Sequence, residues 1–167
     1  MNWKDDMMAE FDQEMGHTRK ELERLPEGKE EWQPHPKSMT VGRLANHLAN
    51  LPSWGVMTVK ESSFDVAPIG GSAYVEDVAP DRTALLATFD RNVAEARSAL
   101  SDLTEADMDA PWSLMAGGQT MFTMPRRAVL RSMIFNHNVH HRAQLGVYLR
   151  MNGVPLPSIY GPSADEQ

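Results

Sequence analysis

The chain has 167 residues, which suits one ordinary domain, so we predict a single domain over residues 1–167. Its 16 lysines and arginines are scattered and outnumbered by 23 aspartates and glutamates, and this net charge of -7 argues against a nucleic-acid partner. The lack of cysteine excludes disulfides and thiolate metal sites, and the lack of any long apolar run argues against a membrane span and favours a cytoplasmic location.

The first predicted helix runs from Trp3 to Pro26, which ends it. Its apolar residues recur at three- and four-residue intervals, as expected of an amphipathic helix. Glu14-Met15-Gly16-His17 within it fits the Glu-x-x-His half-motif of di-iron carboxylate bundles. That motif occurs once where two copies are needed. We therefore interpret it as a solvated helix face.

The second predicted helix spans about residues 41–62, with Ser38 or Thr40 as its cap, and Pro52 should kink or split it. A long connection through several glycines and prolines follows. Asp81 is then a suitable cap for a third helix with the apolar stripe Leu85, Phe89, Val93, Ala96, Leu100 and Leu103.

The helical period is lost between Thr104 and Pro125. Residues 112–115 and 120–123 flank Gly117-Gly118, which indicates a short β-hairpin. Pro125 suits the first turn of a fourth helix, which Asn152-Gly153 ends, and the tail from Val154 to Gln167 is expected to be irregular. Four helices of about 20 residues favour an all-α four-helix bundle.

Three histidines on apolar helix faces predict a metal site. His137 and His141 are four residues apart, so they lie only about 40° apart around the fourth helix. His47 lies on the apolar face of the second helix, one turn beyond Leu44. Two facing helices would thus supply three imidazole nitrogens to one ion. The alternative is that these are hydrogen-bonded core histidines without a ligand.

The other histidines fit a metal site less well. His140 lies about 60° to the other side of His137, and His35 lies between two prolines, where a loop role is expected. Arg142 points about 100° away from the stripe and is expected to serve packing, a carbonyl or a subunit contact. Ligating histidines usually donate their second ring N–H to a polar partner. The candidates for that role are Asn46, Asn138, Gln144 and Tyr148.

The sequence resembles the DinB family of the DinB/YfiT-like superfamily. The matching segments are WQPHPKSMTVGRLANHLANLPSW (32–54), NHNVHHRAQLGVYLRMNGVPLP (136–157) and SIYGPSADE (158–166). The resemblance implies an up-down-down-up bundle with a long crossover between the second and third helices, and a homodimer. It also implies that His47, His137 and His141 bind a divalent metal, with zinc or nickel the usual ions.

The resemblance leaves the reaction open. Characterised relatives in the wider superfamily use low-molecular-weight thiols in isomerase or transferase reactions, whereas most DinB-type members have no assigned reaction. Three neutral imidazoles leave an ion with open coordination positions, as in catalytic sites. We therefore expect a metal-dependent transferase that acts on a small-molecule substrate with a small thiol as cosubstrate. The alternatives are metal-dependent hydrolysis and a metal-binding module without turnover.

Overall fold

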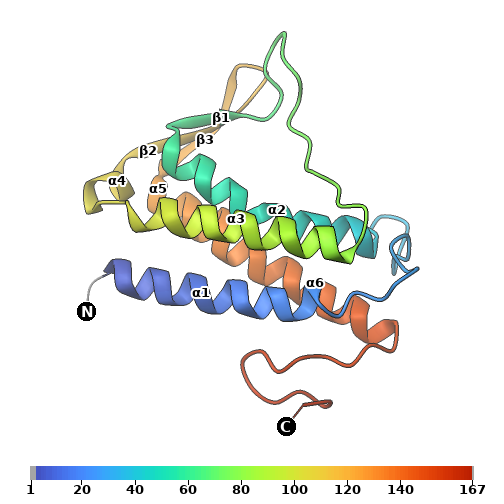
Figure 1. Ribbon diagram of the computed structural model, residues 1–167. Helices are drawn as coiled ribbons and strands as arrows, with labels where there is room; N and C mark the ends of the chain where they lie inside the picture. Colours follow the sequence, from blue (N-terminus) through green and yellow to red (C-terminus); the bar gives the residue numbers. More distant parts are fainter. Residues whose placement is uncertain (1–2, 167) are drawn as a thin grey trace.

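The computed structural model describes residues 3–166 of the chain. Most of these residues are helical. The long helices are α1 (Trp3–Leu22), α2 (Val41–Lys60), α3 (Arg82–Ser101) and α6 (His137–Met151). A short helix α5 (Arg126–Val129) and a π-helical segment η1 (Leu130–Asn136) lead directly into α6. In Figure 1 the four long helices lie side by side, with α1 and α6 running in one direction and α2 and α3 in the other.

The helix ends follow from local side-chain chemistry. The Thr40 hydroxyl accepts a hydrogen bond from the Arg43 amide at 3.2 Å, and the Asp81 carboxylate accepts one from the Ala84 amide at 2.8 Å. Each satisfies an amide that the first turn leaves free. Gly153 ends α6 with a φ of 73°. The predicted caps are thus confirmed, with Thr40 rather than Ser38 at α2.

Pro52 does not split α2, which is one continuous helix from Val41 to Lys60. The predicted split is wrong, and the alternative, a kink at Pro52, stays a prediction. Proline removes one hydrogen bond from the helix interior. Pro52 is buried, and α2 packs extensively against α3, so tertiary packing offsets this local cost.

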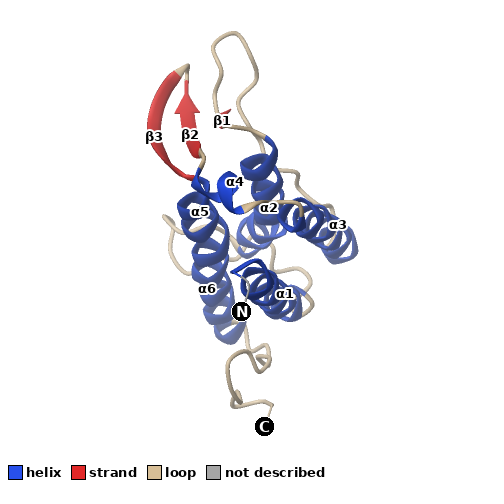
Figure 2. Cartoon of the chain, turned by 90° about the vertical axis from the view of Figure 1, so that its left-hand side faces the viewer, coloured by secondary structure: helices blue, strands red, loops and turns tan. Residues whose placement is uncertain are grey.

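A small sheet caps one end of the bundle (Figure 2). Its strands are β1 (Ser63–Asp65), β2 (Pro111–Ala116) and β3 (Gln119–Pro125), and a short helix α4 (Glu105–Asp109) precedes β2. The predicted hairpin is confirmed as β2 and β3, with Gly117 and Gly118 at φ 60° and 74° in the turn. Strand β1, which pairs parallel with β2, was not predicted.

The sheet is anchored to the bundle by Arg126, which is buried. Its guanidinium donates to the carbonyls of Thr58, Asp107 and Glu61, at the ends of α2 and α4. This fixes the position of the hairpin relative to α2.

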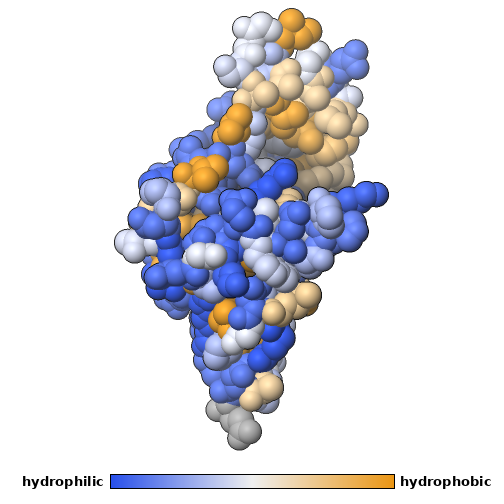
Figure 3. Space-filling model, turned by 90° about the vertical axis from the view of Figure 1, so that its right-hand side faces the viewer, coloured by the Kyte–Doolittle hydropathy of each residue, from blue (hydrophilic) through white to orange (hydrophobic). Residues whose placement is uncertain are grey.

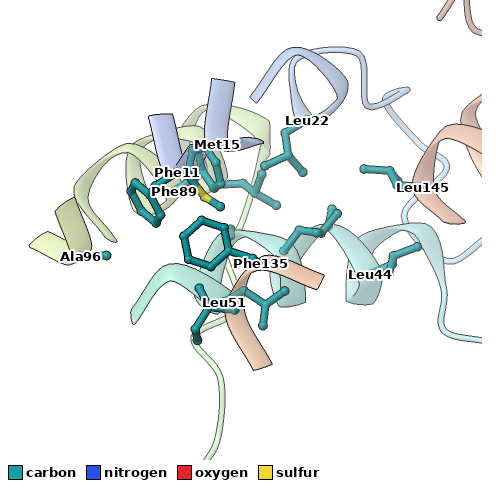
Figure 4. Packing of buried hydrophobic residues seen from close by; sticks show 14 of the residues in the cluster. Phe11, Met15, Leu22, Leu44, Leu51, Phe89, Ala96, Phe135 and Leu145 are labelled. Carbon is teal, nitrogen blue, oxygen red and sulfur yellow. The ribbon is translucent and has the colours of Figure 1, made fainter. Parts of the chain in front are cut away.

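The hydrophobic core lies along the axis of the bundle and draws on all four long helices (Figure 4). Phe11 of α1 packs edge-on against Phe135 of η1, with ring centroids 6.0 Å apart. The segment from residue 66 to residue 81 crosses from β1 to the start of α3 without helix or strand (Figure 1). We call it the crossover segment. Among the described residues, no helix is long and apolar enough to traverse a bilayer.

Candidate metal centre

Three histidine rings meet between α2 and α6. His47 lies in α2, and His137 and His141 lie in the first two turns of α6. The Nε2 atoms of His137 and His141 are 2.7 Å apart, and those of His47 and His137 are 3.4 Å apart. One ring nitrogen from each residue lies within 4.8 Å of the other two.

One of these separations equals that expected between two ligands of a single ion, and the other is shorter. Histidine nitrogens bind zinc at about 2.0–2.1 Å, so two nitrogens at tetrahedral angles lie about 3.4 Å apart. The His47 to His137 distance of 3.4 Å equals this value. The His137 to His141 pair is shorter, as the i to i+4 spacing on one helix allows.

Two of the rings are held by hydrogen bonds on their outer nitrogen. His47 Nδ1 lies 2.7 Å from the Glu76 carboxylate, and His141 Nδ1 lies 2.8 Å from the Gln144 side-chain oxygen. Carboxylate and amide oxygens only accept hydrogen bonds, so both Nδ1 atoms carry the proton. The Nε2 atoms of His47 and His141 are therefore left with lone pairs that face the shared centre.

Burial favours the neutral form of His137 and His141. Burial first, and then the neighbouring His47 and His137, lower the pKa of His141 to about 4, against the opposing effect of its hydrogen bond with Gln144. The pKa of His137 is also lowered, chiefly by burial and then by His47. His137 Nδ1 is buried and has no hydrogen-bond partner among the described residues. The backbone of Met133 acts against burial and partly opposes the lowering of the His137 pKa. Neutral imidazoles are the form that binds metal ions.

The crossover segment closes one side of the centre. It supplies Glu76, and it also supplies Tyr74, whose hydroxyl accepts a hydrogen bond from Trp54 Nε1 at 3.0 Å. The Trp54 ring lies 5.6 Å from the His47 ring and 5.7 Å from the His137 ring, measured between centroids. These aromatic side chains form the wall beside the histidines.

An open pocket of about 800 Å³ leads to this wall. Its lining includes His47, Trp54, Tyr74 and Glu76, together with other residues of α2, of the crossover segment and of the loop that precedes α2. We call it the outer pocket. The outer pocket therefore reaches one of the three histidines, His47.

Of the four polar partners expected from sequence, one contacts a histidine. Gln144 holds His141, as described above. Asn46 accepts a hydrogen bond from the Ala79 amide and so fixes the crossover segment. Asn138, one residue after His137, faces α1, where it bonds to Thr18. Tyr148 lies nearly two turns beyond His141 and packs against Trp32.

The remaining histidines lie outside the centre. His140 is exposed, and its ring lies 4.8 Å from that of His141. His35 is exposed in a loop, where its Nδ1 accepts a hydrogen bond from the Lys37 amide. Neither contributes a nitrogen to the cluster of three.

The interpretation of Glu14 and His17 as a solvated face is wrong. Glu14 is 6% exposed, and its carboxylate lies 2.6 Å from the guanidinium of Arg142 and 2.7 Å from the hydroxyl of Tyr160. Arg142 also donates to the Glu14 carbonyl at 3.0 Å, in line with its expected role in packing and carbonyl binding. The buried Glu14 and Arg142, together with the exposed Tyr160, join α1, α6 and the C-terminal tail on a side of α6 different from that of the metal centre.

Sequence reasoning missed Glu76, Trp54 and Tyr74 as residues of the centre. The one available indication was the length of the crossover segment, because long irregular connections in compact domains are usually functional. Sequence reasoning also gave no prediction of η1, the π-helical segment that ends directly before His137. π-Helical segments recur at functional sites.

Comparison with known proteins places these features in a family context. The sequence profile of the DinB family matches residues 1–167, and none of the curated proteins matches the chain. The fold is similar to that of a DinB-like protein, YjoA, from Bacillus subtilis, with 19% identity, a TM-score of 0.70, and coverage of 95% of this chain and 99% of that chain. A DinB-like protein from Bacillus cereus ATCC 10987 has 23% identity and a TM-score of 0.67, over 91% and 94% of the two chains.

A third solved structure is YfiT from Bacillus subtilis, described as a probable metal-dependent hydrolase with an unusual four-helix bundle topology. It shares 16% identity, with a TM-score of 0.64 and coverage of 90% of this chain and 87% of that chain. At these identities the likeness shows the fold: a mostly helical structure related to four-helix bundles, with a small three-stranded sheet.

Proposed function

Because the chain belongs to the DinB family and three of its histidine nitrogens converge, we propose that it is a metal-dependent enzyme whose ion is held by His47, His137 and His141. Zinc and nickel suit this all-imidazole set, since both bind histidine well. The proposed substrate is a small molecule that enters through the outer pocket.

The observation that carries this proposal is the orientation of the imidazole lone pairs. Glu76 and Gln144 fix the protons of His47 and His141 on the outer nitrogens, which leaves two unprotonated Nε2 atoms facing one centre. His137 brings a third ring nitrogen into contact with both. A cation placed between these nitrogens would be attracted to each lone pair that faces it.

The chain's own residues define the environment of the reaction. When bound, a divalent ion would lower the pKa of a coordinated water or thiol toward neutrality and polarise a carbonyl group. Glu76 orients His47, and its carboxylate also lines the outer pocket, where it can accept a proton from a nucleophile. Burial raises the pKa of Tyr74, so its hydroxyl stays protonated.

Hydrolysis is the reaction that this arrangement supports best. The sequence alone places no carboxylate as a general base, but in the structure Glu76 lies beside His47. The description of YfiT as a probable metal-dependent hydrolase supports the same assignment. A purely structural metal site would have no need of an open pocket at its ligands.

Thiol transfer, the expectation from sequence, is the second candidate. One observation favours it: at about 800 Å³, the outer pocket has room for a low-molecular-weight thiol beside a second small molecule. In this reaction the thiol sulfur would attack an electrophilic substrate in place of water.

A pair of neighbouring histidines provides the test. We expect the purified protein to bind one equivalent of zinc or nickel, and we expect His141→Ala to lose both the metal and the activity. The matched control is His140→Ala, which removes the exposed neighbour and should retain both. Metal content is measured by mass spectrometry. Turnover of ester and amide substrates is then measured with and without added thiols.

Turnover without thiol identifies a hydrolase, and turnover that requires thiol identifies a transferase. A protein that binds no stoichiometric metal, or one whose metal content is unaffected by His141→Ala, would overturn the proposal.

A further inference from the structure

An apolar cavity of about 100 Å³ lies between α2, the three-stranded sheet and η1. Its lining includes Trp54, Met57, Tyr74, Leu114, Phe122 and Met133, and its accessible wall is entirely apolar. We call it the inner cavity. It lies at the end of the molecule that carries the sheet and the crossover segment, where hydrophobic residues also gather on the surface (Figure 3). The metal chemistry proposed above does not use it.

The inner cavity begins at the wall of the metal centre. Trp54 and Tyr74 line both the inner cavity and the outer pocket. The ring of Trp54 also contacts the rings of His47 and His137. Met133, another lining residue, lies one helical turn before His137. A molecule held at the histidines would therefore have an apolar hollow directly beside it.

A cavity of this kind favours an apolar occupant. Protein interiors are close-packed, and an empty space forfeits the dispersion contacts of the atoms that line it. A water molecule there would lack the two or more polar partners that it needs. Apolar cavities of about 150 Å³ are known to bind benzene. A cavity of about 100 Å³ suits a short branched alkyl group, and small shifts of the flexible side chains of Met57 and Met133 would admit a single aromatic ring.

We propose that the inner cavity binds the apolar part of the substrate while the histidines hold its reacting polar group. This inference rests on the proposed function and names its substrate class: a small ester or amide whose acyl group is short and branched or carries one phenyl ring. In the ester case, the water oxygen bonds to the acyl carbon and the bond from that carbon to the alkoxy oxygen breaks. One proton of the water leaves with the alcohol.

Binding can be tested without catalysis. Benzene is titrated into the zinc-loaded protein while the methionine methyl groups are observed by NMR. We expect saturable shifts for Met57 and Met133, which line the cavity, and none for the exposed Met121. Val66→Phe adds a ring to the cavity wall and should abolish these shifts. Val147→Phe makes the same change at an exposed position on α6 and should leave them intact.

A second variant covers the case in which Val66→Phe fails to fold. Met57→Ala enlarges the cavity and should tighten the binding of toluene relative to benzene. Wild-type protein that shows no saturable shift with either compound would overturn the inference.

Substrate selection is the second readout. Along a series of acetyl, isobutyryl and isovaleryl esters, we expect kcat/KM to rise for the wild type, since an added methylene is worth roughly tenfold or more in an apolar pocket. Val66→Phe should reverse this order, and Val147→Phe should not.

The two proposals fail in different ways. If benzene binds but no ester or amide is hydrolysed, hydrolysis is wrong and the cavity remains a ligand site. If hydrolysis occurs with the same chain-length preference in Val66→Phe as in the wild type, the cavity assignment is wrong and hydrolysis stands.

Discussion

Glu21, on the inner face of α1, makes the stability of the protein depend on pH. The residue is 6% exposed, and its Oε2 atom has no hydrogen-bond partner among the described residues. Burial raises its pKa from 4.5 to about 7, while Arg142 and Arg24 oppose the shift. The folded protein therefore holds a proton on Glu21 at pH values where the unfolded chain has lost it.

The direction and size of the effect follow from this difference. Because the pKa is raised on folding, the contribution of Glu21 is fully present below pH 4.5 and is lost as the pH rises through about 7. Each unit of pKa difference corresponds to about 1.36 kcal/mol. Between pH 5 and pH 8, the free energy of unfolding should thus fall by about 2.5 kcal/mol more in the wild type than in Glu21→Gln, which cannot ionise.

Urea denaturation at pH 5 and pH 8 measures this difference. Glu23→Gln changes an exposed glutamate two residues away and should follow the wild type. Parallel pH profiles for the wild type and Glu21→Gln would refute the reasoning, because they would mean that Glu21 ionises equally easily in the folded and unfolded chains.

Three further predictions concern the metal centre and the hairpin beside the bundle. Glu76→Gln weakens the hydrogen bond that orients His47 and should lower the affinity for zinc about 10- to 100-fold. A chelator competition titration that finds the zinc affinity unchanged would contradict this prediction. Arg126→Met removes three hydrogen bonds to carbonyls at the ends of α2 and α4. In urea titrations it should lower the free energy of unfolding by about 2 kcal/mol or more. An unchanged free energy of unfolding would mean that other contacts hold the hairpin. Gly118→Ala places a side chain at a φ of 74° and should lower the free energy of unfolding by about 1–2 kcal/mol. Gly161→Ala, in open space, should not lower it. Equal melting curves for the two variants would argue against a strained turn.

Local chemistry explains why the helices and the hairpin could be predicted from the sequence. Apolar periodicity marks the helices, Thr40 and Asp81 mark two helix starts, and Gly117-Gly118 marks the hairpin turn. Each of these depends on residues close together in the chain. The convergence of His47 with His137 and His141 was also predictable, since each lies on the apolar face of its own helix.

The features that sequence reasoning missed depend on distant partners. Strand β1 has three residues, too few to show a period, and it forms only because β2 lies beside it. The burial of Glu14 depends on Arg142, which is 128 residues away. Glu76 comes from an irregular segment, where no periodicity indicates the direction of a side chain.

The central claim is that three histidines bind one metal ion and leave it open to a substrate. X-ray absorption at the zinc edge of the zinc-loaded protein tests it most directly. We predict three histidine nitrogens at about 2.0–2.1 Å together with at least one further light-atom ligand that is not a histidine. A spectrum that shows fewer than three histidines, or a fourth protein ligand that completes the shell, would contradict the account.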